Sequence, residues 1–303
     1  MKTIKYTILF LLFICTMQVS GQQMPQYSQY MFNDFIINPA IAGVHDHYQI
    51  RTNHRFQWAG MNDPPITNSI AFYGPHSKMD MGFGGSIFTD ITGPTSRTGV
   101  SGSYAYNILL FNDIRLSAGL SFSILQYRVD GTQFDFEVLQ DQFDPVIQPI
   151  VSTNYLPDAA TGIYIYGDDF YAGISSAQLL NNKLHIFNLD DAVGINRLKT
   201  HVFITGGYRY EVDPEWVIEP SAIVKLSAPK QYKFEATARV EWMRMVWLGV
   251  GYRMHEAVNI IAGYNYSDKF YFGYSYDIGV SHIRFYNSGS HEIMIGYKFD
   301  NLK

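Results

Sequence analysis

The stretch KQYKFEATARVEW, residues 230–242, alternates strictly between two kinds of side chain. One register is apolar and consists of Tyr232, Phe234, Ala236, Ala238, Val240 and Trp242. The other is polar and mostly charged, and consists of Lys233, Glu235, Thr237, Arg239 and Glu241. A strand sends successive side chains to opposite faces, so the stretch predicts a β-strand with one apolar and one charged face. In a soluble sheet the apolar face is inside, whereas in a membrane barrel it faces lipid and the charges line the lumen.

The same period of two recurs along the chain, and helical periodicity is nearly absent. We predict about 14 strands, and most of them reach the roughly 9–11 residues that a tilted strand needs to cross a bilayer. Their expected spans are 48–58, 66–73, 80–89, 96–108, 113–128, 158–166, 169–176, 200–211, 215–227, 231–242, 244–254, 257–266, 269–278 and 289–299.

The lengths of the expected connections sort by parity. Every long one is odd in the order of the chain: AGMNDPP (59–65), 129–157, 177–199 and GVSHIRFYNS (279–288). Outer-membrane barrels have short periplasmic turns and long outer loops, which explains this sorting. The sequence therefore predicts an all-β fold, a transmembrane antiparallel up-and-down β-barrel in the bacterial outer membrane with both termini periplasmic. A secreted soluble β-sandwich would show the same alternation but leaves the loop sorting unexplained.

The N-terminus has the pattern of a secretory signal peptide. Lys2 and Lys5 precede the apolar run YTILFLLFIC (6–15), which is too short to anchor the chain in a bilayer. Its Cys15 is the single cysteine, so the mature chain is expected to hold no disulfide. A lipoprotein interpretation of Cys15 is weaker, because Ile14 is bulky where a small residue is needed. The expected divisions are a signal peptide (1–21), an N-terminal periplasmic or plug segment (22–46), the barrel (47–300) and a short tail (301–303).

Composition argues against several functions. Net charge is −5 and charged residues are 16% of the chain, which excludes the basic field that nucleic-acid binding needs. No local signature marks a catalytic nucleophile, and we expect no enzyme activity and no cofactor. His45 and His47 share a face, but the spacing fixes no third ligand, so no metal site is predicted.

The expected inward register carries both signs of charge. Candidate lumen charges are Lys233, Glu235, Arg239, Glu241, Arg253 and Glu292, and the same register holds Arg115, Glu219, Lys225 and Lys298. Mixed signs within reach of neighbouring strands predict a self-neutralising interior, and inward Gly and Ser leave room for water, a loop or a plug. If the lumen is wet, Arg at Thr237 should cost much less than Arg at the lipid-facing Ala236 or Ala238.

The segment before the first expected strand is not strand-like. Its run SQYMFNDFIINPAIAG (28–43), followed by RTNHRFQWAGM (51–61), resembles the opening of the PorP/SprF family of type IX secretion system membrane proteins. Asp34 departs from the apolar character expected there. Candidate partner-binding or plug residues in these runs are Gln29, Tyr30, Met31, Phe32, Asn33, Asn38, Pro39, Ala40, Gly43, Arg55 and Trp58.

The resemblance implies a component of the type IX protein secretion and gliding machinery. Such a protein would sit in outer-membrane lipid and bind a secreted cargo protein, such as a large adhesin or its C-terminal domain, for export or surface anchoring. It would also contact periplasmic machinery proteins. The alternative is a passive outer-membrane channel or small-ligand transporter. Segment 22–46 plugs the lumen, caps its periplasmic mouth, contacts a partner, or simply fills space; the residues alone leave these roles open.

Overall fold

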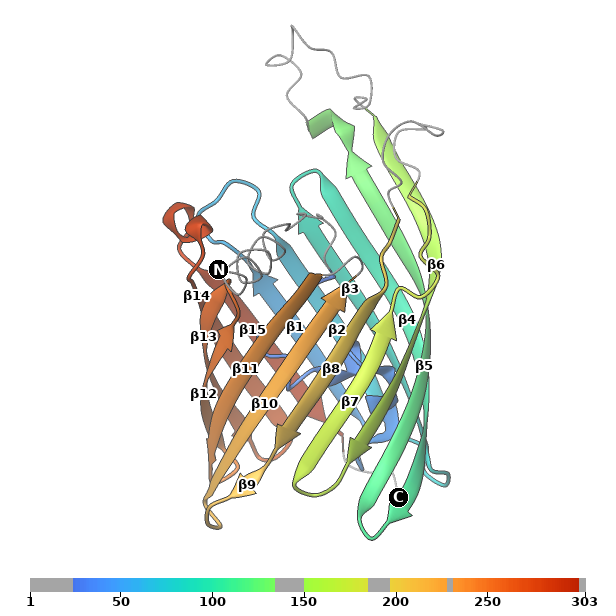
Figure 1. Cartoon of the computed structure of the whole chain (residues 1–303), viewed down its shortest axis with the longest axis vertical. Coiled ribbons are helices and arrows are strands. Elements are labelled where there is room, and N and C mark those ends of the chain that lie inside the picture. Colours follow the sequence, from blue (N-terminus) through green and yellow to red (C-terminus); the bar gives the residue numbers. More distant parts are fainter. Residues whose placement is uncertain (1–23, 134–149, 185–196, 228–230, 300–303) are drawn as a thin grey trace, which may run out of the picture.

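The computed structural model describes residues 24–133, 150–184, 197–227 and 231–299. They form a single antiparallel sheet that closes on itself, because β1 pairs with β15 and β10 pairs with β11 (Figure 1). The result is a closed barrel of fourteen strands with one extra short strand, β9. The strands are β1 (Gln49–Phe56), β2 (Ile66–Pro75), β3 (Met81–Thr92), β4 (Thr95–Phe111), β5 (Ile114–Asp130), β6 (Val151–Tyr166), β7 (Phe170–Ala177), β8 (His201–Tyr208), β9 (Tyr210–Glu211), β10 (Trp216–Ser227), β11 (Gln231–Trp242), β12 (Val246–Arg253), β13 (Ala257–Tyr266), β14 (Phe270–Gly279) and β15 (Ser290–Lys298).

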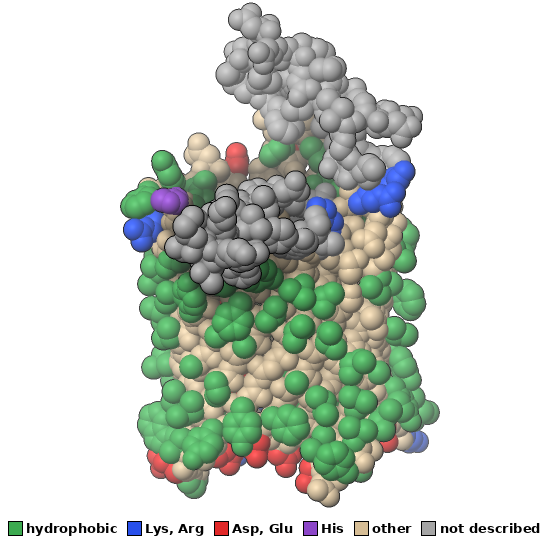
Figure 2. All heavy atoms as spheres, viewed as in Figure 1, with side chains coloured by type: hydrophobic (Ala, Val, Ile, Leu, Met, Phe, Trp, Pro, Cys, Tyr) green, Lys and Arg blue, Asp and Glu red, His purple; other side chains and the backbone are tan. Residues whose placement is uncertain are grey.

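The outer wall is an apolar belt. On β5, Leu120 is 53% exposed and Phe122 is 71% exposed, while Ser121 between them is buried. Hydrophobic side chains cover the wall in Figure 2, and acidic side chains gather at its lower rim. An exposed apolar surface of this extent is unfavourable in water and favourable against hydrocarbon. The apolar side chains of each strand therefore face lipid, and the polar side chains between them face the lumen.

The two ends of the barrel differ. The strand ends joined by the long connections 57–65, 131–150, 178–200 and 280–289 all lie at one end of the barrel, which we call the long-loop end. The other, the short-turn end, carries turns such as 112–113 and 243–245. Trp216 and Trp242 meet there across β10 and β11 with ring centroids 6.2 Å apart, as expected for an aromatic girdle at a membrane interface.

Two strands differ from the sequence prediction. β6 begins at Val151 rather than at 158, although Pro157 interrupts its run. Proline is tolerated because β7 pairs only with Thr161–Tyr166, which leaves the earlier part of β6 as a sheet edge. The expected strand 200–211 divides into β8 and β9 at Arg209. The register of the two pairings with β10 places the preceding residue, Tyr208, opposite Pro220, which has no N–H for a ladder bond.

Helical structure in the described residues is limited to short 3-10 turns. η1 (Asp34–Ile36) and η2 (Pro39–Gly43) precede β1, η3 (Gly131–Gln133) follows β5, and η5 (His282–Tyr286) follows β14. No helix in this part of the chain is long and apolar enough to span a membrane.

Candidate functional site

Residues 24–48, which we call the plug, pass through the lumen of the barrel (Figure 1). Met24 lies at the long-loop end, beside Phe203 and Lys225. Gly43 lies near the short-turn end, against the start of β3 at Gly82. The plug thus extends through the lumen rather than only across one mouth. The first and last residues of the chain, 1–23 and 300–303, lie outside the described residues, so the expected signal peptide and the expected periplasmic termini are not placed.

The motif Asn-Pro-Ala starts the tighter turn of the plug. Asn38 is the N-cap of η2, and its side-chain oxygen accepts a hydrogen bond from the Ala40 backbone N–H at 3.0 Å. Pro39 suits the first helical position because its missing N–H would be unpaired there. The Asn38 amide also donates to the Ile163 carbonyl on β6 at 3.1 Å. One side chain therefore both starts the turn and ties it to the wall.

Glycines in the wall receive the plug backbone. A Cβ at Gly82 would collide with the Gly43 backbone, and one at Gly119 would collide with the backbone at Ala40. Hydrogen bonds seal the same contacts: Asn107 donates to the Gly43 carbonyl at 2.8 Å, and Ser117 donates to the Ala40 carbonyl at 2.6 Å. These strand glycines are therefore sockets for the plug, which explains small inward residues better than general crowding does.

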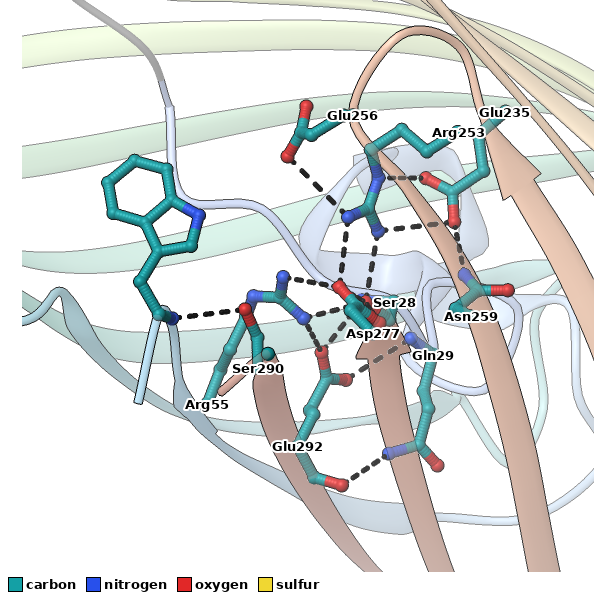
Figure 3. Close-up of polar contacts among 12 residues, drawn as sticks. Ser28, Gln29, Arg55, Glu235, Arg253, Glu256, Asn259, Asp277, Ser290 and Glu292 are labelled. Carbon is teal, nitrogen blue, oxygen red and sulfur yellow. Dashed lines mark hydrogen bonds and ion pairs between the residues drawn. The ribbon is translucent and has the colours of Figure 1, made fainter. Parts of the chain in front are cut away.

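A buried ion network anchors the other half of the plug (Figure 3). The Ser28 hydroxyl donates to Asp277 at 2.8 Å and accepts from Arg55 at 2.6 Å and from Arg253 at 2.9 Å. The Ser28 backbone N–H donates to Glu292 at 2.7 Å. One small side chain of the plug thus lies between charges from β1, β12, β14 and β15.

The charges around Ser28 compensate one another. Arg55 pairs with Asp277 at 2.7 Å and Glu292 at 3.3 Å, while Arg253 pairs with Asp277 at 3.0 Å and Glu235 at 2.9 Å. Each of these five side chains is at most 3% exposed. Charges this deeply buried are tolerated only when paired and hydrogen-bonded, so the network fixes the strands and the plug relative to one another.

The remaining candidate residues of the plug contact the wall outside this network or at its margin. Gln29 donates to the Glu292 carbonyl at 3.2 Å, Asn33 donates to Asn53 at 2.7 Å, and the Tyr30 hydroxyl lies 3.1 Å from that of Ser221. The ring centroids of Phe32 and Trp247 are 4.8 Å apart. The Arg239 guanidinium lies over the Phe32 ring, 4.8 Å from its centroid. Met31 packs against a cluster that includes Tyr30, Ile37, Phe203 and Ile223. Trp58 lies apart, after β1, where its backbone N–H donates to Ser290 at 3.1 Å.

The structure places all six candidate lumen charges in ion pairs. The pairs are Lys233–Glu256 at 2.9 Å, Glu235–Arg253 at 2.9 Å, Arg239–Glu219 at 2.5 Å, Arg239–Glu241 at 3.4 Å, Arg253–Asp277 at 3.0 Å and Glu292–Arg55 at 3.3 Å. Thr237 is 3% exposed, so the lumen is packed rather than wet at that position. The expected low cost of Arg at Thr237 does not apply, because no space receives the side chain.

The short-turn end of the plug carries His45 and His47, whose ring centroids are 5.6 Å apart. The Asp46 carboxylate lies 2.7 Å from Nδ1 of His47, and this hydrogen bond lowers the pKa of Asp46. Across the described residues, no group of three or more His, Cys, Asp or Glu side chains is placed to hold a metal ion.

Two partners of the network were missed by the sequence reasoning. Asp277 occupies the inward register of its strand, so the alternation of 270–278 carried a signal that a charge faces the lumen there. Ser28 carried none, because a serine before the first strand has no periodicity to place it. The sockets at Gly82 and Gly119 follow only from the path of the plug.

Among solved structures, the chain is similar to outer-membrane barrels. The Ralstonia pickettii toluene transporter TbuX has a TM-score of 0.53 at 10% identity, over 87% of this chain and 92% of that one. The monoaromatic hydrocarbon channel CymD has a TM-score of 0.52 at 11% identity, over 92% of this chain and 95% of that one. At these identities the likeness concerns the fold alone. No curated protein sequence matches the chain significantly.

A family description covers nearly the whole chain. The model of the type IX secretion system membrane protein PorP/SprF matches residues 19–297, from before the plug to the last but one residue of β15. The match includes the plug, its wall sockets and the ion network that holds it. With the closed barrel and its apolar belt, it establishes that the chain is an outer-membrane protein of the PorP/SprF family of type IX secretion system membrane proteins.

Proposed function

We propose that this barrel is a docking component of the type IX secretion and gliding machinery, not an enzyme. It binds a secreted cargo protein at the long-loop end and machinery proteins at the short-turn end, for export or surface anchoring of the cargo. The short-turn end then faces the periplasm, in keeping with the loop lengths. The observation that supports this function is the plug: its sockets and its buried ion network hold protein where an open pore would hold water.

The cargo-binding end has exposed aromatic side chains. On η5, in the connection between β14 and β15, Phe285 is 70% exposed and Tyr286 is 76% exposed. Rigid aromatic side chains of this kind dominate protein–protein contacts. At the opposite end the turns are acidic, with Asp168 and Asp169 before β7 and Asp213 before β10.

Co-purification of the tagged protein from native outer membranes tests the proposal. We expect both a secreted cargo protein and a periplasmic machinery component to co-elute with the wild type. The double variant Phe285→Asp, Tyr286→Asp should lose the cargo and keep the periplasmic component. The double variant Asp168→Lys, Asp169→Lys should do the reverse. Recovery of the barrel without either class of partner would contradict the proposed function.

The alternative function, a passive channel or small-ligand transporter, requires the plug to leave the lumen. A cavity of about 120 Å³ beside the plug is the observation that favours it. Conductance in a planar bilayer separates the two functions.

A further inference from the structure

The lumen cation Lys225 lacks a counter-ion among the described residues. Lys225 on β10 forms no ion pair within 4.0 Å with any residue that the structure describes. Two carboxylates whose charges act on Lys225 pair with other cations: Glu235 pairs with Arg253 at 2.9 Å, and Glu256 pairs with Lys233 at 2.9 Å. Lys225 therefore differs from the six lumen charges described above, each of which is paired.

The strand register adds repulsion at Lys225. This residue lies directly opposite Lys233 on β11 and directly opposite the apolar Phe203 on β8. Like charges in directly opposed positions of a sheet destabilise it, and an apolar neighbour does not solvate an ammonium group. The position of Lys225 thus costs stability and brings no compensating ion pair within the described fold, which is typical of a functional group.

Lys225 borders two adjoining cavities between the plug and the wall. The outer one, about 50 Å³, reaches the rim of the barrel at Ser227 and Gln231. The inner one, about 120 Å³, has apolar walls that include Ile36, Ile37, Phe88, Leu125 and Phe203. By the same measure a water needs roughly 10–15 Å³, so the inner cavity has room for a chain of several carbon atoms.

We propose that these cavities bind a small monocarboxylic acid with an apolar tail, its carboxylate on Lys225 and its tail against the apolar wall of the inner cavity. A cation at the junction of the two cavities selects an anionic head, and the apolar walls select the tail. Asp158 lines the wall of the inner cavity on β6, where it accepts the Leu180 N–H at 3.2 Å. A second carboxylate on the tail would meet this acidic group, so diacids are disfavoured. The site is additional to the docking function proposed above.

Binding of hexanoate to the full barrel in lipid nanodiscs, followed by saturation-transfer NMR, tests the site. We expect hexanoate to bind the wild type, hexanamide and the six-carbon diacid adipate to bind more weakly, and Lys225→Gln to weaken hexanoate by about tenfold or more, the scale of one charge-assisted contact. Lys298→Gln removes a lumen charge at the short-turn end and should leave binding unchanged. Lys225→Arg should retain most of it.

Stability separates a binding role from a structural one. Because Lys225→Gln removes the repulsion with Lys233, the unliganded variant should unfold no more easily than the wild type. A tetrapeptide ending in leucine presents the same chemistry from a polypeptide, and its binding in place of hexanoate would overturn the assignment to a small acid. No hexanoate binding, equal binding of hexanamide, or equal binding to the Lys225→Gln variant would overturn the site altogether.

Discussion

Neighbouring residues of one strand lie in different environments, one against lipid and the next inside the barrel. Leu120 faces lipid at the middle of the apolar run of β5, whereas Ser121, 8% exposed, lines the inner cavity. Leu120→Arg should lower the free energy of unfolding by about 2–4 kcal/mol, the cost of a charge near the bilayer midplane. Ser121→Arg should cost clearly less, because the cavity receives the side chain. Chemical unfolding in lipid vesicles measures both, and equal penalties would mean that the two faces are wrongly assigned.

Burial decides the value of an ion pair. Arg55 lies between Asp277 and Glu292 at 1% side-chain exposure. Arg55→Met leaves the buried Glu292 without its cation and Asp277 with Arg253 alone, and should cost about 3–5 kcal/mol of stability. Arg115 pairs with Asp80 at 3.5 Å, but their side chains are 40% and 69% exposed, and Arg115→Met should cost about 1 kcal/mol or less. Unfolding midpoints of the two variants provide the comparison. Similar losses would show that the network is solvated.

At the scale of elements, β3 and β4 offer a matched pair of glycines. Gly82→Ala pushes a methyl group into the plug backbone at Gly43 and should destabilise by about 1–3 kcal/mol. At Gly102, on the neighbouring strand, no atom lies within 4 Å of the position that a methyl group would take. Gly102→Ala should therefore be neutral or stabilise by about 0.4–1 kcal/mol through the unfolded chain. If both substitutions were neutral in thermal unfolding, the plug would not occupy the sockets.

The elements also show how far the sequence could predict the structure. Period-two alternation located the strands and their lipid-facing sides, because each strand meets lipid on one face whatever its neighbours are. The alternation predicted that β6 starts after Pro157 and that β8 and β9 form one strand. Both predictions were wrong, because these features depend on where a neighbouring strand stops pairing. The alternation could not predict the path of residues 24–48. Contacts such as that of Ser28 with Asp277 join positions far apart in the chain and follow no period.

At the scale of the whole molecule, the plug predicts poor conductance. In a planar bilayer the wild type should pass little current, and a variant lacking residues 24–44 should pass a sustained current through the vacated lumen. Ser28→Leu, which keeps the plug but removes its central hydrogen bonds, should give intermittent openings. Heat-modifiable gel mobility checks that each barrel is folded. A wild type that conducts as well as the deletion would favour the channel alternative.

The position of Ser28 links the plug to the order of assembly. Its partners come from β1, which follows the plug in the chain, from β12, and from β14 and β15, which are made last. Because β1 and β15 form the closing seam, these partners converge only when the barrel is complete. A barrel that has not yet closed offers the plug at most some of the glycine sockets, and its ion network around Ser28 is incomplete. The plug is therefore held firmly only after the barrel has closed, and the lumen becomes filled at the last step of assembly.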